Sequence, residues 1–141
     1  MIIIGLKSVK CENFKEVSKI EDIDSGNSLV WFEEMLDRNF VLSNHCEDNA
    51  LPYGVLVRNI SVTKLLVYAS KGAKYFILTS GRHLGDIDIE ELKAFQNVAN
   101  DYLLDIKILY VINNVADIDV IADARLDGAI FVNYLMKGEL A

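Results

Sequence analysis

Residues 79–85, Thr-Ser-Gly-Arg-His-Leu-Gly, hold the most reactive-looking side chains in the sequence. They place hydroxyls, a guanidinium and an imidazole between an apolar run and a helical pattern. Arginine and backbone N–H groups near a helix start suit a phosphate or carboxylate. Gly81 and Gly85 would let the backbone approach a ligand closely. The loop lacks both the Gly-Lys-Thr/Ser of a P-loop and Gly-x-Gly-x-x-Gly. We therefore expect an anion-binding loop, with an ordinary solvent-exposed loop as the alternative.

Polar residues also follow the other expected strands. Ligands of parallel α/β sheets bind at the carboxyl ends of the strands. The polar residues at these ends, besides residues 79–83, are Glu33, Glu34, Arg58, Asn59, Asn113, Asn114, Asn133 and Tyr134. Each of them alone could also be a loop residue or a helix cap. The ligand-binding set that we predict is Thr79, Ser80, Gly81, Arg82, His83, Asn113, Asn114 and Asn133.

Other chemistries have weaker support. His45, Cys46 and His83 match none of the usual zinc spacings, so we expect no metal and no cofactor. Nothing in the sequence activates a cysteine, and Cys46 is best interpreted as a small buried side chain on a helix. Lys74 and Lys107 begin their strands, which is the wrong end for a Schiff-base lysine. His83 is the remaining candidate for a catalytic acid or base.

Composition limits the classes of partner. The chain has 141 residues, 52% of them apolar, and one proline, which favours a single packed α/β domain over residues 1–141. Its net charge is −7 and its 14 basic residues are scattered, so we expect neither a nucleic acid nor an acidic membrane surface as partner. Two cysteines and an apolar start too short for a signal or a membrane span favour the cytoplasm.

The order of apolar runs predicts repeated βα units. We expect strands at residues 1–6, 29–33, 53–58, 74–79, 106–112 and 129–132. Helices are expected at residues 34–49, 61–71, 88–104 and 117–126, and a short amphipathic helix on Phe14, Val17 and Ile20. A strand at residues 40–42 is the rival interpretation of the segment 34–49. The residues expected at helix ends are the caps Asn59 or Ser61, Asp88 with Glu91, and Asp117, and the terminating glycines Gly72 and Gly128.

These units predict an α/β fold with a mainly parallel sheet of five to six strands and right-handed crossovers. Two arrangements remain open. One is a three-layer sheet of Rossmann-like or flavodoxin-like type. The other is a half (βα)₈ barrel, because six strands are too few to close the eight-stranded form.

Residues 72–140 carry a sequence of motifs that resembles a known family. The motifs are Gly72-Ala73, residues 76–80, Gly81-Arg82-His83, residues 110–114, residues 127–132 and residues 135–140. They resemble the C-terminal part of the phosphate-binding (βα)₈ barrels of the histidine-biosynthesis isomerase and cyclase type. Short bacterial α/β proteins also look like this.

The resemblance implies βα units and a phosphorylated sugar-like substrate. Its functional positions differ in this chain. Ser80 stands at the family's catalytic Asp, Asn113-Asn114 at the phosphate-binding glycine pair, and Asn133 at the glycine after the last strand. The resemblance therefore favours the fold more than the activity.

Three functions follow from these patterns. The first is a non-catalytic protein that binds a small anionic metabolite or a protein partner. The second is an enzyme acting on a phosphorylated sugar-like substrate, with His83 as acid/base and Arg82 as anion clamp. The third is a structural subunit that forms a homo-oligomer, in which a half-barrel or an edge strand such as Met1–Leu6 pairs with a copy of itself.

Overall fold

The computed structural model describes residues 1–10, 13–23, 29–79 and 89–141. These residues form a seven-stranded, all-parallel sheet in the order β1-β7-β6-β5-β4-β3-β2. The strands are β1 (Ile2–Ile4), β2 (Phe14–Glu16), β3 (Leu29–Glu33), β4 (Tyr53–Val57), β5 (Tyr75–Leu78), β6 (Lys107–Ile112) and β7 (Gly128–Phe131). From β2 to β7, strands that follow one another in the chain lie side by side, and β1 is added next to β7.

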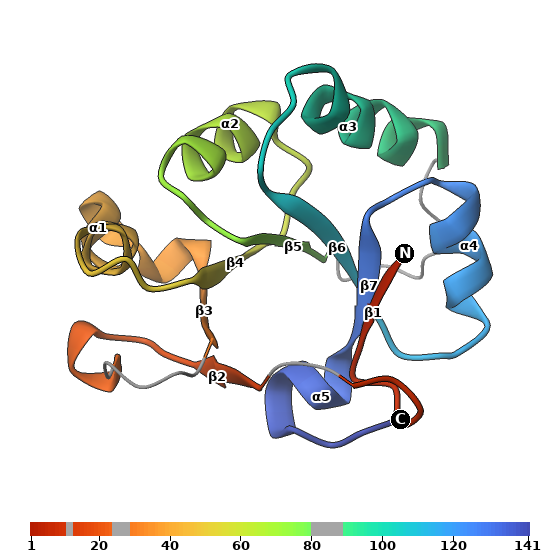
Figure 1. Cartoon of the computed structure of the whole chain (residues 1–141), viewed down its shortest axis with the longest axis horizontal. Helices are drawn as coiled ribbons and strands as arrows, with labels where there is room; N and C mark the ends of the chain where they lie inside the picture. The colour runs from red at the N-terminus through yellow and green to blue at the C-terminus, as the bar shows by residue number, and fades with distance from the viewer. Residues whose placement is uncertain (11–12, 24–28, 80–88) are drawn as a thin grey trace.

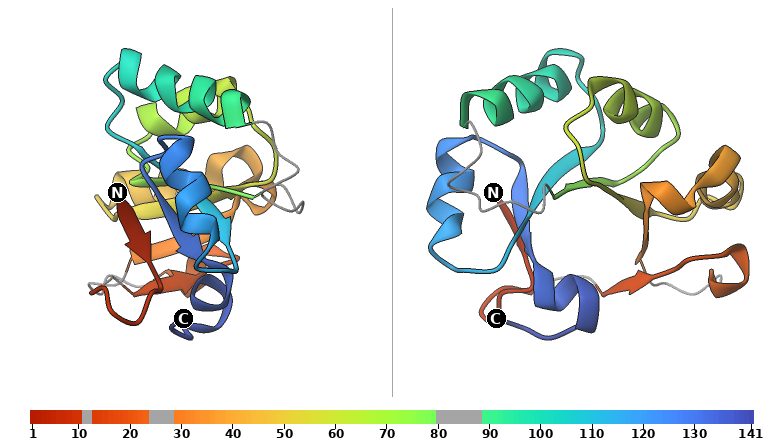
Figure 2. Two further views of the ribbon diagram at one scale, coloured as in Figure 1. Left: turned by 90° about the vertical axis from the view of Figure 1, so that its right-hand side faces the viewer. Right: turned by 180° about the vertical axis from the view of Figure 1, so that it is seen from behind.

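The helices of the described residues surround this sheet. They are α1 (Val41–Asp48), α2 (Val62–Ser70), α3 (Ile89–Asp101), α4 (Asp117–Asp123) and α5 (Val132–Lys137), with 3₁₀ turns η1 (Ile20–Asp22), η2 (Glu34–Leu36) and η3 (Arg38–Phe40). Figure 1 shows α1 to α4 on the outer side of the curled sheet. Helix α5 lies where the two edges of the sheet, β1 and β2, approach each other, as the reverse view in Figure 2 also shows.

Side-chain contacts demonstrate the curl. The rings of Phe14 on β2 and Tyr75 on β5 lie 5.5 Å apart, although β3 and β4 separate these strands in the sheet. A Cβ at Gly54 would lie 3.5 Å from Phe14 Cε1 and 3.6 Å from Trp31 Cβ. All of these groups therefore occupy the concave face, and the absent side chain of Gly54 leaves room for the Phe14 ring.

The convex face packs against the helices. Phe76 of β5 lies 5.6 Å from Phe95 of α3, measured between ring centroids. Phe32 and Tyr53 stack on the same side, with ring centroids 5.5 Å apart. Because both faces of the central strands are buried, these strands are apolar throughout instead of alternating with polar residues.

Helix α5 depends on a glycine in the seam between β1 and β2. Gly5 has φ +91°, and a Cβ there would lie 2.5 Å from Tyr134 Cβ. The hydroxyl of Tyr134 is 3.5 Å from Oδ1 of Asn13, which precedes β2. Tyr134 therefore connects α5 to both sides of the seam.

The structure confirms the α/β class, the parallel sheet and the βα repeats. Of the two arrangements left open, the curled half-barrel is the one observed. The strand at residues 29–33 is confirmed, and the rival strand at residues 40–42 is wrong because Val41 begins α1. The helix expected over residues 34–49 is divided into η2, η3 and α1.

The sheet has seven strands, more than the five to six expected, because the segment around Phe14 forms a strand that the sequence did not predict. The amphipathic helix expected on Phe14, Val17 and Ile20 is wrong, since Phe14–Glu16 forms β2 and pairs with Leu29 to Trp31. The spacing of three residues that suggested a helix is accidental. The Phe14 ring fills the concave interior, and Val17 N bonds to Trp31 O at 2.9 Å.

Two of the expected helix ends are confirmed. Ser61 Oγ accepts a hydrogen bond from Lys64 N at 3.2 Å and caps α2. Gly72, with φ +84°, follows the same helix in the left-handed conformation. Asp88 lies outside the described residues, so its pairing with Glu91 stays a prediction.

The expected ends of α4 are wrong. Asp117 is not the cap, because it is the first residue of α4 and Ala116 precedes it as the N-cap; Asn114 Oδ1 accepts a bond from Ala116 N at 2.9 Å. Gly128 does not end the helix either, because it is the first residue of β7 and Arg125, with φ +57°, takes the left-handed conformation. A Cβ at Gly128 would lie 2.0 Å from Ile2 O, so this glycine allows β1 to pair with β7.

Candidate functional site

The carboxyl ends of the parallel strands form one rim of the curled sheet. Register places Val57 beside Leu78, Leu78 beside Tyr110, and Ile112 beside Phe131, so β4 to β7 end close to one another. Thr79 N continues the ladder by donating to Val57 O at 3.0 Å. The polar residues that follow these strands therefore share one end of the molecule, as the sequence predicted.

An ion pair joins the ends of β3 and β4. Arg58 Nη2 donates to Glu33 Oε1, and the side chains are 56% and 29% exposed, respectively. Alternation along the strands puts Glu33 on the face of Trp31, and Arg58 on the face of Gly54, which is the concave face. The pair fixes the direction of the Arg58 side chain and leaves much of the guanidinium accessible to solvent.

The neighbouring acid, Glu34, points elsewhere. Its Oε2 accepts a hydrogen bond from Lys64 Nζ of α2 at 3.1 Å. Glu33 and Glu34 thus serve two separate ion pairs, one at the rim and one between η2 and α2. This arrangement does not bring the two carboxylates together as an acid/base pair.

Trp31 places a buried polar atom inside the curl. Its side chain is 0% exposed, and in the described part of the chain Nε1 is the buried side-chain polar atom that lacks a hydrogen-bond partner. Trp31 precedes Glu33 by two residues on the same strand face. A buried donor without an acceptor is costly, so this atom favours an acceptor from a ligand or water.

Four residues of the predicted ligand set are described. Thr79, half-buried, follows Tyr75 and Ile77 in the alternation toward the concave face, and Asn113 is exposed just after β6. Asn114 and Asn133 are at helix starts: Asn114 bonds to Ala116 N, and Asn133 lies exposed in the first turn of α5. Thr79 and Asn113 therefore share the rim between β5 and β6. Ser80, Gly81, Arg82 and His83 lie outside the described residues.

The Glu33–Arg58 pair at the rim and the buried Trp31 N–H on the concave face were not in the predicted set. Glu33 and Arg58 were candidates as strand-end residues, and their opposite charges at the ends of consecutive strands were the available signal. Nothing in the sequence identifies Trp31, because its unpaired N–H results from the residues that surround it in the folded chain.

Cys46 has the structural role expected for it. Its side chain is fully buried on α1, and burial, with a smaller effect of the Asp37 charge, raises the thiol pKa to about 11. The thiol is therefore protonated and unreactive near neutral pH. Burial also raises the pKa of Tyr68, whose hydroxyl donates to Asp37 Oδ2 at 2.8 Å.

The described residues contain no group of three or more His, Cys, Asp or Glu arranged to hold a metal ion. Nor does this part of the chain have a helix with the length and apolar character needed to cross a membrane. No family model matches the chain, and no curated protein matches it in sequence. The resemblance to phosphate-binding barrels therefore stays a prediction.

Proposed function

We propose that this protein binds a small anionic metabolite, bearing a phosphate or a carboxylate, at the carboxyl-end rim and does so without catalysis. The described residues that would contact it are Arg58, Thr79 and Asn113. The sequence adds Arg82 and the rest of the loop 80–83 as expected contacts, together with Asn114 and Asn133 at the adjoining helix starts.

The geometry of Arg58 is the observation that supports this proposal most. Its guanidinium is held by Glu33 on the concave side of the rim, with N–H groups left for a second acceptor. Charge-assisted hydrogen bonds of this kind are the strong ones in protein–anion recognition. Glu33 orients the arginine, and it also offsets part of the positive charge that an anion would meet.

Other polar side chains near Arg58 can also donate hydrogen bonds. The Thr79 hydroxyl and the Asn113 amide directly follow β5 and β6, and the buried Trp31 N–H lies deeper, on the concave face of β3. Sites for small ligands combine an apolar lining with a few polar groups that converge, and a set rich in donors matches the oxygen atoms of a phosphate or carboxylate.

A thermal-shift screen tests this proposal. The wild type, Arg58→Ala and Arg82→Ala are compared against phosphate, sugar phosphates, nucleotides and dicarboxylates. Lys107→Ala, which removes an exposed cation at the amino end of β6, is the matched control. At a ligand concentration of about 100 times Kd, binding stabilises the fold by about 2.7 kcal/mol. We expect one ligand class to raise Tm by several degrees in the wild type and the control, and less in both arginine variants.

Fluorescence provides a second readout, because Trp31 is the single tryptophan of the chain. A ligand at the rim should change the emission of Trp31 with the same Kd as the thermal shift. The proposal fails if no ligand class stabilises the wild type, or if the stabilisation is unchanged in both arginine variants. Turnover of a sugar phosphate that is lost in His83→Ala while binding persists would instead identify an enzyme.

A further inference from the structure

A pocket of about 330 Å³ lies beside the carboxyl ends of β2 and β3. One wall is formed by residues 18–21, which follow β2, and the other by residues between Leu36 and Leu42, which follow β3. Small-molecule sites have volumes of roughly 300–1,000 Å³, so this pocket is at the lower end of that range. Neither Glu33 nor Arg58 lines it, which distinguishes it from the rim site.

Half of the residues that line this pocket are aliphatic. Its apolar lining residues are Ile20, Leu36, Val41 and Leu42. Leu42 is buried in the core, whereas Leu36 and Val41 are 40% and 46% exposed. Covering these two side chains with an apolar group would remove hydrocarbon from water at about 25 cal/mol per Å².

Two cations face the same pocket from opposite walls. Lys19 comes from the first wall and Arg38 from the second, and both are exposed. Within the described part of the chain neither side chain makes a hydrogen bond or an ion pair, although the charge of Lys19 contributes to the lowered pKa of Asp22. Glu21 is the acid that lines the pocket, so the lining charge is positive in a chain of net charge −7.

The carboxylate of Asp22, next to the pocket, already has partners. Asp22 Oδ2 accepts hydrogen bonds from Ser18 N and Ser18 Oγ, both at 3.2 Å. The backbone bond from Ser18 is the largest cause of the lowered pKa of Asp22. These bonds hold the wall after β2 in place, and Lys19, Arg38 and Glu21 remain as the charged side chains that line the pocket.

Asp37 holds the second wall. Its carboxylate is buried and accepts hydrogen bonds from Leu42 N at 2.8 Å, Ser43 N at 3.0 Å and Tyr68 Oη at 2.8 Å.

The residues between Asp37 and Val41 include Asn39 and Phe40, which both have left-handed backbone conformations, with φ 53° and 57°. Such conformations cost of order 1–3 kcal/mol each and persist where the surroundings enforce them. The turn places Arg38 and Val41 on the wall of one pocket.

We propose that this pocket binds an amphipathic carboxylate. The aliphatic or aromatic body of the ligand covers Leu36 and Val41, and the carboxylate lies between Lys19 and Arg38. This site is additional to the anion site at the rim and does not depend on it. The class of ligand follows from the lining, because aliphatic side chains and two cations in one pocket match a molecule with one apolar part and one anionic part.

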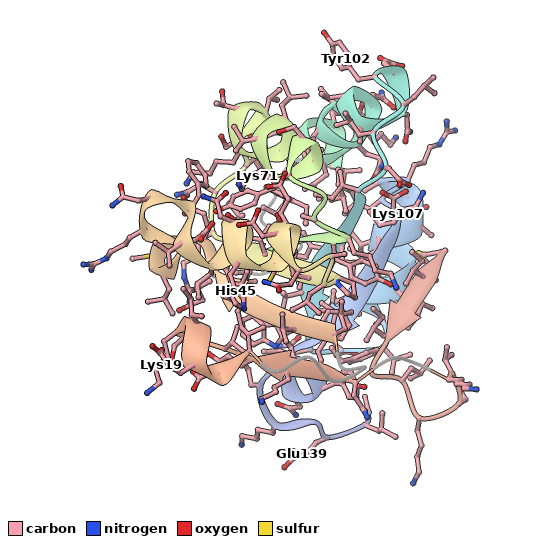
Figure 3. The ribbon with its side chains drawn as sticks, turned by 60° about the vertical axis from the view of Figure 1, so that its left-hand side comes forward. Lys19, His45, Lys71, Tyr102, Lys107 and Glu139 are labelled. Atoms are coloured by element: carbon pink, nitrogen blue, oxygen red, sulfur yellow. The ribbon has the colours of Figure 1, made fainter. Side chains whose placement is uncertain are left out.

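Calorimetric titration with octanoate tests this proposal. Octanamide, which has the same chain without the charge, and acetate, which has the charge without the chain, are the ligand controls. The variants are Lys19→Glu and Arg38→Glu, and Lys107→Glu is the charge-matched control. Figure 3 labels Lys19 and Lys107 and shows them at opposite sides of the molecule. All of these side chains are exposed, so the variants should fold, and thermal unfolding checks that they do.

We expect saturable binding of octanoate to the wild type with a stoichiometry of one. Octanamide, acetate and the two pocket variants should bind roughly tenfold more weakly or worse, and Lys107→Glu should bind within about twofold of the wild type. The proposal is overturned if octanoate does not bind, or if octanamide binds equally well. If octanoate does not bind and Val41→Asp dissociates an oligomer, the apolar surface contacts another protein chain and not a small ligand.

Discussion

The amino and carboxyl ends of the curled sheet differ in how far their polar side chains are hydrogen-bonded within the chain. At the amino end, Gln96 of α3 is 1% exposed and bonds to Asp127, which precedes β7. Asp127 Oδ2 accepts from Gln96 Nε2 at 3.0 Å and from Ile108 N at 2.8 Å, while Asp127 N donates to Gln96 Oε1 at 2.9 Å. This network joins α3, β6 and β7, and its polar groups form hydrogen bonds with one another.

At the carboxyl end the polar side chains are more exposed and make fewer hydrogen bonds within the described part of the chain. Arg58 bonds to Glu33 but remains over half exposed, and Asn113 is exposed. In barrel-like folds the amino end generally serves stability and the carboxyl end binds ligands. The difference predicts that substitutions at the amino end change stability, whereas substitutions at the rim change binding.

The largest effect should come from Gly128→Ala. The new Cβ would lie 2.0 Å from Ile2 O, which is backbone and cannot move without disturbing the pairing of β1 with β7. We expect a loss of about 3 kcal/mol in the free energy of unfolding, measured with urea. Gly54→Ala is the control, because its new Cβ meets the tip of Ile77 at 3.1 Å, and its loss should stay below about 1.5 kcal/mol. Equal losses would contradict the special role of Gly128.

Asp127→Ala should rank second. It leaves Ile108 N and Gln96 Nε2 without their carboxylate acceptor, which should lower the free energy of unfolding by about 2–3 kcal/mol. Asp123→Ala removes an exposed carboxylate from α4 and should change stability by less than about 0.5 kcal/mol. Indistinguishable values for the two variants would mean that the network does not hold the amino end together.

High pH should destabilise the protein through Cys46. The folded thiol has a pKa of about 11 against an ordinary value of 9.0, so the unfolded chain loses this proton first. Stability is then fully present below pH 9 and falls as the pH rises toward 11, by about 1.4 kcal/mol at pH 10 from this group. Tyr53 and Tyr68, whose pKa values burial also raises, add to the decline. Urea unfolding between pH 8 and 10 should show a shallower decline in Cys46→Ala than in the wild type. An unchanged slope would argue against this assignment.

The smallest effect on stability should come from Arg58→Ala. An ion pair this exposed contributes roughly 0–1 kcal/mol, so unfolding in urea should change by less than about 1 kcal/mol. The same variant should lose the ligand-induced rise in Tm. A loss of stability comparable to that of Asp127→Ala would show that the two ends of the sheet are not specialised as we infer.

Local patterns sufficed for the central strands and for α2. The runs at Leu29–Glu33, Tyr53–Val57 and Tyr75–Leu78 are apolar throughout because helices and the concave interior bury both faces, and this leaves a clear signal in the sequence. Ser61 and Gly72 were predictable because a cap acts within a few residues of its helix end. The predicted rim residues Thr79 and Asn113 follow from the same strand boundaries.

The parts that escaped prediction depend on residues far apart in the chain. Phe14–Glu16 is a strand because β3 offers it an edge and because Gly54 leaves space for the Phe14 ring. In the sequence, Gly128 looks like a glycine that ends a helix. Only the folded chain shows that it lies beside the carbonyl of Ile2.

The order of apolar runs, caps and charges along the chain was enough to assign the α/β class, the parallel strands and the end of the sheet where the strand-end polar residues gather. The curl of the sheet, the position of α5 in its seam, the Glu33–Arg58 pair, the Asp127–Gln96 network and the pocket beside β2 could not be read from that order. Each of these requires contacts between segments that are far apart in sequence, and their geometry is fixed only when the strands pack into a single curved sheet.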